Sequence, residues 1–266
     1  MSASTSNATV VVEDFFSRLP RAVQRVLMLD YDGTLAPFRE NRAEAEPYPG
    51  VRECLDALME DTHTRVVLVT GRWTKDLLPL LQLRRLPEIW GSHGWEQLRP
   101  NGQYALAPIN KGALRGLIEA DEWTEQIIAL GGRCERKPGS LAIHWRGLSA
   151  LQIAKIEQAV HENWTRLSAP SELEWHDFDG GIELRARGRN KGHVVETILS
   201  EMRNGMAAYL GDDNTDEDAF RAIKGRGLSV LVRPTHRPTA ADVWLRPPAE
   251  LLVFLDRWRE MREDSA

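Results

Sequence analysis

Apolar and polar positions along the chain alternate between two patterns. Short, nearly continuous apolar runs are typical of buried strands, and they occur at Val26–Leu29, Arg65–Thr70, Glu88–His93, Ala207–Leu210, Leu228–Val232 and Asp242–Leu245. Between these runs, apolar residues recur at helical spacing, as expected for helices that bury one face. Strands that alternate with helices predict an α/β fold, with a Rossmann-like, mainly parallel sheet covered on both sides.

The predicted helices cover residues 11–19, 51–58, 72–83 and 216–223, with further helices that begin near Lys191 and after Pro247-Pro248. The expected buried stripe of the last helix consists of Leu251, Leu252, Leu255 and Trp258. The Asn101-Gly102 pair predicts a hairpin, because this dipeptide favours the tight turns that join paired strands. The first nine residues, rich in Ser, Thr, Ala and Asn, are interpreted as a disordered tail rather than a signal peptide.

The pattern changes between residues 108 and 187. A helix over 110–130 precedes strands at 133–137 and 140–146, and a second helix over 149–167 precedes strands at 172–177 and 181–185, joined at Asp179-Gly180. This order predicts a compact α+β unit with both helices on one face of a four-stranded sheet. Residues 1–107 and 188–266 then form the core into which this unit is inserted.

Alternation along the inserted strands separates an apolar face, expected to lie under the helices, from a polar one. The predicted polar face carries Glu135, Lys137, His144, Arg146, Glu183 and Arg185. The simplest interpretation is the solvated side of a one-sided sheet. Carboxylates and cations in alternation would also suit a neutral, polyhydroxylated ligand, because carboxylates accept hydroxyl hydrogens while Lys and Arg donate.

Size and charge limit the classes of function. The chain has 266 residues, enough for one large domain or a core with an insert. A net charge of −5 argues against a general nucleic-acid binder, which needs a basic surface. No apolar run approaches the ~20 residues that span a bilayer. Cys54 and Cys134 are interpreted as small buried residues in a reducing compartment. We therefore expect a cytoplasmic location, no membrane or nucleic-acid partner and no obligate protein partner.

Acidic side chains follow two of the predicted strands, at the point where each strand ends. Asp30 and Asp32 come directly after the first strand, and Asp212 and Asp216 follow the strand at 207–210. Ligands of open parallel sheets bind at the carboxyl ends of the strands. Mg²⁺ prefers oxygen ligands, so the late acidic cluster is a candidate metal site, although acidic residues at a strand end can also form a solvated turn.

Four motifs, in this order, resemble those of the haloacid-dehalogenase-like (HAD) phosphatase superfamily: Leu27–Ala36, Val66–Arg72, Asn190–Gly192 and Tyr209–Asp218. The resemblance runs from about Val26 to the last helix. It implies that Asp30 is a nucleophile that forms an aspartyl-phosphate and that Asp32 is the general acid and base. It further implies that Thr70 binds a phosphoryl oxygen and that Lys191 orients Asp30. The implied cofactor is Mg²⁺, held by Asp30, the Asp32 carbonyl and Asp212, with Asp216 acting directly or through water.

A narrower resemblance is to the trehalose-6-phosphate phosphatases, which hydrolyse trehalose 6-phosphate to trehalose and phosphate. It rests on Leu29–Pro37, Gly91–Gly94, Glu135–Ser140 with His144–Arg146, Glu183–Arg185 and Gly211–Phe220. It implies that the insert is a C2-type cap whose open face closes over the active site and binds sugar hydroxyls. The implied substrate-binding residues are Gly71, Arg72, His93, Glu135, Lys137, Ser140, His144, Arg146, Glu183 and Arg185. His93 is equally compatible with a structural loop histidine.

Two departures from that family stand in this sequence: Thr70 replaces the frequent Ser, and Ala186 replaces the usual Pro after Glu-Leu-Arg. Alternatives are a phosphatase for sucrose 6-phosphate, a glucosylglycerol phosphate or a mannosylglycerate phosphate. A glycosyltransferase that uses Asp-x-Asp to hold a metal-nucleotide is disfavoured by Lys191 and Gly211-Asp-Asp. A regulatory module without activity is disfavoured because every expected catalytic residue is present.

Overall fold

The computed structural model describes residues 2–39, 41–168, 172–178 and 180–261, with side chains from residue 9 onward except those of residues 166 and 168. Two compact units make up the chain: residues 1–105 with 190–266, and residues 106–189. Among the described residues, no helix has both the length and the apolar character that a bilayer span requires.

The first unit is built on an eight-stranded sheet in the order β12-β11-β10-β1-β2-β3-β4-β5. Its strands are β1 (Gln24–Leu29), β2 (Thr64–Val69), β3 (Glu88–Gly91), β4 (Glu96–Leu98), β5 (Tyr104–Leu106), β10 (Gly205–Gly211), β11 (Leu228–Val232) and β12 (Val243–Leu245). All neighbours from β12 to β3 pair in parallel, and β4 pairs antiparallel with β3. The expected α/β core with a mainly parallel sheet is confirmed.

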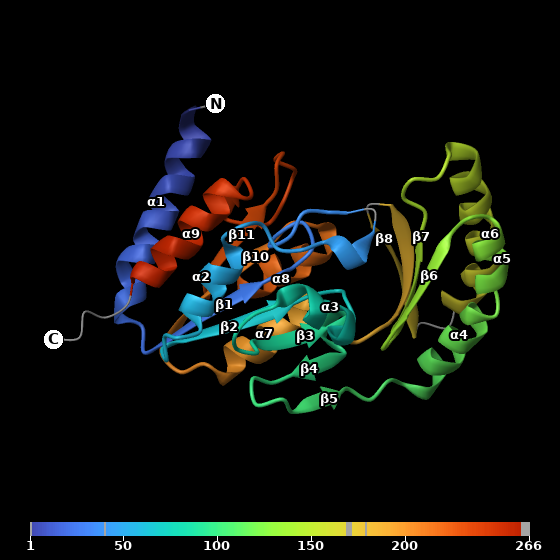
Figure 1. Cartoon of the computed structure of the whole chain (residues 1–266), viewed down its shortest axis with the longest axis horizontal. Helices are drawn as coiled ribbons and strands as arrows, with labels where there is room; N and C mark the ends of the chain where they lie inside the picture. The colour runs from blue at the N-terminus through green and yellow to red at the C-terminus, as the bar shows by residue number, and fades with distance from the viewer. Residues whose placement is uncertain (1, 40, 169–171, 179, 262–266) are drawn as a thin grey trace. The chain divides into compact units, whose positions relative to one another are not determined.

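Helices cover both faces of this sheet. Alternate residues of β1 point to opposite faces, and each set packs in a different apolar cluster with different helices. Leu27 and Leu29 pack with α1 (Ser2–Arg18), α2 (Val51–Leu58), α3 (Thr74–Leu81) and α9 (Ala249–Glu260). Val26 and Met28 pack with α7 (Lys191–Glu201) and α8 (Glu217–Ile223). Figure 1 shows α1 beside α9, where the Phe15 and Trp258 rings lie 5.8 Å apart.

The second unit is a four-stranded sheet in the order β6-β7-β9-β8 with helices over one face (Figure 1). Its elements are α4 (Lys111–Asp121), α5 (Thr124–Ala129), β6 (Arg133–Lys137), β7 (Ser140–His144), α6 (Ala150–Ser168), β8 (Leu173–Phe178) and β9 (Gly181–Ala186). The buried side chains of Leu141, Ile143 and Leu184 line the face that the helices cover. Of the expected turn Asp179-Gly180, the first residue lies outside the described residues.

Four predictions of element boundaries were wrong. Of the first nine residues, which were predicted to be a disordered tail, residues 2–9 belong to α1. Phe15 and Phe16 anchor this helix in the core, and each residue added toward its start gains one backbone hydrogen bond. The helix predicted over 110–130 breaks after Asp121, whose carbonyl accepts a bond from the Thr124 hydroxyl at 2.8 Å. The strand predicted to include His93 ends at Gly91.

The strand predicted over 140–146 ends at His144. Both neighbours of this strand, β6 and β9, begin directly opposite His144, at Arg133 and Gly181. Beyond it, the Trp145 amide still donates to the Gly180 carbonyl at 2.9 Å, but the regular pairing has ended. Arg146 therefore lies beyond the sheet, next to Gly180, and not on the polar face where alternation placed it. Two further expectations also need correction: Cys134 is only partly buried, although Cys54 is buried as expected, and Leu252 is partly buried while Phe254 joins the α9 stripe.

Candidate active site

The first part of the site is the loop that follows β1. Asp30 lies at the carboxyl end of this strand, where its amide donates to the carbonyl of Leu210 on β10. Tyr31 is buried in the core, and its hydroxyl donates to the Ala45 carbonyl at 2.7 Å. Gly33 turns the chain with φ +83°, and a Cβ there would lie 2.2 Å from Asp212 Oδ2. Only glycine therefore permits the close approach between this loop and the acidic loop after β10.

Lys191 joins the two loops through its ammonium group. Lys191 is the first residue of α7, and the Asn190 side chain caps the start of this helix. The Lys191 Nζ lies 2.7 Å from Asp30 Oδ1 and 2.7 Å from Asp216 Oδ1. All three side chains are buried, so the two carboxylates share one cation in an environment of weak screening.

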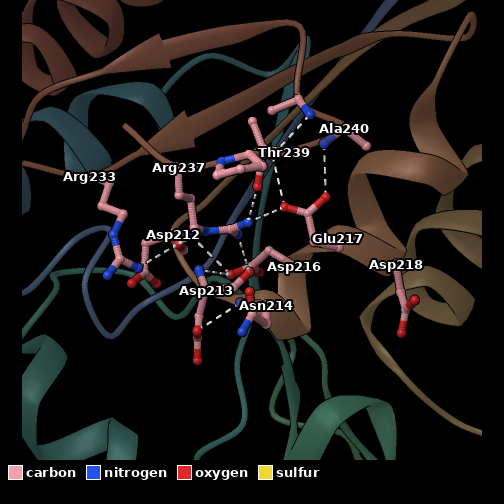
Figure 2. Close-up of polar contacts among 12 residues, drawn as sticks. Asp212, Asp213, Asn214, Asp216, Glu217, Asp218, Arg233, Arg237, Thr239 and Ala240 are labelled. Atoms are coloured by element: carbon pink, nitrogen blue, oxygen red, sulfur yellow. Dashed lines mark hydrogen bonds and ion pairs between the residues drawn. The ribbon is translucent and has the colours of Figure 1, made fainter. Parts of the chain in front are cut away.

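Asp216 organises the loop after β10. Its Oδ1 accepts from Lys191 and from the Tyr209 hydroxyl at 2.6 Å, and its Oδ2 accepts from the amides of Asp212 and Asp213. Four donors occupy the lone pairs that a carboxylate offers. Asp216 is therefore suited to orienting Lys191 and the loop rather than to binding a metal directly. Figure 2 shows the neighbouring Asp213 carboxylate directed toward Asn214, whose amide donates to it.

The site residues fit a divalent cation. One oxygen each from Asp30, Asp212 and Asp216 lies within 4.8 Å of the others. Asp212 Oδ1 is buried and has no hydrogen-bond partner among the described residues. Asp30, Asp212 and Asp216 lie near the single ammonium group of Lys191. Burial raises the pKa of Asp212 well above its ordinary value, and the negative charges of Asp30 and Asp216 raise it further. A cation between Asp30 and Asp212 would satisfy the orphaned oxygen and the excess negative charge.

Asp32 forms a two-pronged ion pair with Arg72. Arg72 Nε and Nη2 lie 2.7 and 2.6 Å from its two oxygens, and Arg42 lies 3.5 Å away. Burial alone would raise the pKa of Asp32, but the Arg72 guanidinium holds it below its ordinary value. Arg72, expected among the substrate-binding residues, is therefore engaged with the carboxylate expected to act as general acid and base.

Thr70, Gly71 and His93 form one wall at the end of β2. Because Leu29 pairs with Leu68 on β2, Asp30 and Thr70 emerge at the same sheet edge. The Thr70 hydroxyl accepts from the Arg72 amide at 3.1 Å. His93 is buried with φ +55°, its amide bonds the Thr70 carbonyl, and its ring packs so closely on Gly71 that a Cβ there would lie 2.5 Å from it.

The polar face of the second unit is built around the buried carboxylate of Glu183. Its Oε1 lies 2.5 Å from Lys137 Nζ and accepts from Ser140 Oγ at 2.8 Å. Its Oε2 accepts from Arg185 Nε at 2.6 Å. On the same face, His144 Nε2 lies 2.8 Å from Glu135 Oε2. Strand register places Glu135 and Glu183 on either side of Ala142 in one row. All the predicted face residues except Arg146 thus gather on this sheet.

A model of the family described as trehalose-phosphatase matches residues 28–246, which include all of the second unit and most of the first. The chain belongs to the trehalose-phosphatase family.

A curated relative is similar over most of the chain, and solved structures share its fold. The trehalose-phosphate phosphatase of Mycobacterium tuberculosis is 31% identical over 260 residues, covering 91% of this chain and 63% of that protein. The C-terminal domain of the Candida albicans trehalose-6-phosphate phosphatase covers 94% of this chain and 96% of its own, with a TM-score of 0.74 and 21% identity. A haloacid dehalogenase-like hydrolase from Bacteroides thetaiotaomicron shares the fold at a TM-score of 0.63 and 16% identity, covering 88% of this chain and 99% of its own. The chain spans less than two thirds of the length of the curated relatives that it matches first.

Several residues of this site received no role from the sequence. Tyr209 is the first residue of the fourth motif, and its place in a buried strand, where a tyrosine hydroxyl needs a partner, could have pointed to a role for it. Arg233 and Arg237 lie in the loop between β11 and β12, and both donate to the Asp212 carbonyl. No motif marks them, because their contacts depend on the path of that loop.

Raising the pH from about 5 to about 8 is expected to lower the free energy of unfolding of this family member when metal is absent. Burial, opposed by Lys191 and reinforced by Asp216, raises the pKa of Asp30 to about 7. Between its ordinary pKa of about 3.9 and that value, the folded protein binds more protons than the unfolded chain. Stability therefore falls with rising pH across this window, by at most about 1.4 kcal/mol per pH unit for one group.

Urea unfolding at several pH values, in the presence of a chelator, would measure this slope. Mg²⁺ should flatten it because a bound cation favours the ionised carboxylates. Asp30→Asn should reduce the slope without metal, and an unchanged slope in this variant would assign the effect to other groups. The low pKa of Asp32 does not interfere, since that carboxylate loses its stabilising contribution only as the pH falls below about 4.

Proposed function

We propose that this protein is a Mg²⁺-dependent phosphomonoester hydrolase that converts trehalose 6-phosphate to trehalose and phosphate through an aspartyl-phosphate on Asp30. The observation that carries the proposal is the buried cluster in which Lys191 bridges Asp30 and Asp216 beside the orphaned oxygen of Asp212. Membership of the trehalose-phosphatase family supplies the substrate class.

In the first step, Asp30 attacks phosphorus through the oxygen that does not face Lys191. A bond forms between this oxygen and phosphorus, and the bond from phosphorus to the sugar oxygen breaks. Lys191 fixes the rotamer of Asp30 through its 2.7 Å contact and stabilises charge in the transition state. The Thr70 hydroxyl would bind a phosphoryl oxygen. Mg²⁺, held by Asp30, Asp212 and the Asp32 carbonyl, would offset the negative charge of phosphate and carboxylate.

Asp32 moves the proton in both steps. It donates to the departing sugar oxygen, and it then takes a proton from the water that attacks the aspartyl-phosphate and releases phosphate. The Arg72 pair favours the ionised form of Asp32, which is the form required in the second step. For the first step, Asp32 must leave Arg72 and acquire a proton. Because the two-pronged pair holds the Asp32 carboxylate in place before that step, we assign Arg72 to positioning Asp32.

The second unit would recognise the sugar. Glu183 and Glu135 offer acceptor oxygens to hydroxyl groups, while Lys137, Arg185 and Ser140 offer donors. The mutual bonds of these groups hold their rotamers before a ligand arrives, which lowers the entropic cost of binding.

Phosphate release from a panel of esters tests the proposal. The panel contains trehalose 6-phosphate, sucrose 6-phosphate, a glucosylglycerol phosphate, a mannosylglycerate phosphate, glucose 6-phosphate and an aryl phosphate, each with Mg²⁺ and with a chelator. We expect kcat/KM to be highest for trehalose 6-phosphate and to vanish with the chelator. Preference for another sugar phosphate would retain the chemistry and overturn the assigned substrate.

Glu183→Gln is expected to lower kcat/KM for trehalose 6-phosphate by about 10-fold or more, because a site built for hydrogen bonding to hydroxyl groups loses a buried acceptor charge. Turnover of the aryl phosphate should stay within about two-fold, since that ester lacks the hydroxyl groups. Glu174→Gln is the matched control: Glu174 lies on the same face, more exposed and paired with His176. An equal loss on both substrates would remove Glu183 from sugar recognition.

A further inference from the structure

The loop between β11 and β12, residues 233–242, is bonded to the acidic loop after β10. Arg237 Nη2 donates to the Asp213 carbonyl at 2.8 Å, and its Nε donates to the Asp212 carbonyl at 3.4 Å. Arg233 Nη1 reaches the same Asp212 carbonyl at 3.3 Å. Figure 2 shows both arginines directed at the backbone that carries Asp212.

The same loop is fixed to Glu217, the residue that follows Asp216. One Glu217 oxygen lies 2.5 Å from Arg237 Nη1 and accepts from the Thr239 hydroxyl at 2.8 Å. The other accepts from the Ala240 amide at 2.9 Å (Figure 2). The side chains of Arg237 and Glu217 are only 17% and 15% exposed. This ion pair is thus better shielded from water than the surface pairs that contribute little.

Arg237 therefore contacts the acidic loop on both sides of Asp216. It holds two carbonyls before that residue and a carboxylate after it, so one planar guanidinium spans the segment that presents Asp212 and Asp216. A lysine ammonium could not make these bonds together, because it lacks the fixed fork of donors. None of these bonds reaches a carboxylate of the metal site, so Arg237 acts on the shape of the loop.

We propose that Arg237 is a positioning residue for the metal: it fixes the conformation of residues 212–217 in which the Asp212 carboxylate faces Asp30. This inference rests on the proposed function, because the cation whose binding Arg237 supports is the Mg²⁺ of that proposal. Groups that orient metal ligands from outside the coordination shell typically change metal affinity by about 10–100-fold when they are removed.

Calorimetric titration of the resting, metal-free protein with MgCl₂ tests this without turnover. We expect Arg237→Met to raise the Kd for Mg²⁺ by about 10-fold or more. Arg237→Lys should recover only part of the loss, and Glu217→Gln should weaken binding in the same direction. Adding Glu217→Gln to Arg237→Met should cost less than it does in the wild type, because the two residues act through one pair. In kinetics, the Mg²⁺ concentration for half-maximal rate should rise with Kd, while KM for trehalose 6-phosphate at saturating Mg²⁺ should stay within about two-fold.

Arg221→Met is the matched control, because Arg221 pairs with Asp218 on the exposed side of the neighbouring helix α8; its Kd should equal that of the wild type. An unchanged Kd in Arg237→Met would overturn the proposal, as would an equal rise in Arg221→Met. If Arg237→Met does not fold, the milder Arg237→Lys and Glu217→Gln decide by the same titration. A wild type that binds Mg²⁺ but does not hydrolyse trehalose 6-phosphate would overturn the proposed substrate alone, and one that binds no divalent cation would overturn both proposals.

Discussion

Replacing Asp30 with asparagine is expected to lower kcat for trehalose 6-phosphate by on the order of 10⁴-fold or more while the protein stays folded. The amide nearly conserves the shape of the side chain but cannot form the covalent intermediate. The fold should tolerate the change because Lys191 keeps its 2.7 Å contact with Asp216 and the cluster loses one of three buried carboxylates. Metal-free Asp30→Asn should therefore be at least as stable as the wild type at pH 8.

Rapid acid quenching with ³²P-labelled substrate would measure the intermediate directly. Protein-bound label should appear in the wild type and be absent from Asp30→Asn. Asp56→Asn is the control, because Asp56 is also a buried carboxylate but pairs with Arg84 and contacts none of the site residues named above. That variant should lose stability and retain kcat. Turnover of Asp30→Asn within about ten-fold of the wild type would exclude Asp30 as the nucleophile.

Asp32→Asn is expected to separate the two steps of the reaction. With trehalose 6-phosphate, loss of the proton donor should lower the rate by about 10²–10⁴-fold. With an aryl phosphate, the leaving group departs without a proton, so the aspartyl-phosphate should still form. Its hydrolysis needs the base, and the intermediate should therefore accumulate.

A stopped-flow experiment with the aryl phosphate would show this as a burst of one equivalent of phenol per enzyme, followed by a slow phase. The wild type should show steady turnover. Glu46→Gln, which alters an exposed acid paired with Arg52 in the loop before α2, should behave like the wild type. A variant of Asp32 that lowers the rates for both esters equally and gives no burst would contradict the assigned role.

The strand ends that carry Asp30, Thr70 and Asp212 could be predicted because each follows an apolar run bounded by a turn. Period-two alternation likewise placed Glu183, Lys137 and Arg185 on one face, and strand register agrees with that placement. These are local signals, and the folded structure agrees with them because burial of one strand face determines the strand register.

Contacts between loops could not be predicted in this way. The Arg72 pair with Asp32 joins residues 40 apart, and the Arg237 bond to the Asp213 carbonyl joins residues 24 apart. Neither has a periodic signal, because loop conformation decides which donors reach which acceptors. The break between α4 and α5 was missed for a related reason: Arg136 on β6 reaches Asp121 and Thr124, which rewards a turn that helix propensity alone would not favour.

Because residues 106–189 interrupt the core unit, the two parts of that unit are synthesised at different times. Asp30 precedes Lys191 by 161 residues, a delay of roughly 8–30 s at a translation rate of about 5–20 residues per second. During that time β1 has β2 beside it, but β10 has not yet been made, so one edge of the future central strand has unpaired backbone groups. Residues 106–189 form a compact unit of their own and emerge in the interval. Nascent chains arrested before β10 should therefore contain a folded second unit attached to an incomplete sheet with an unpaired edge, the form most dependent on chaperones.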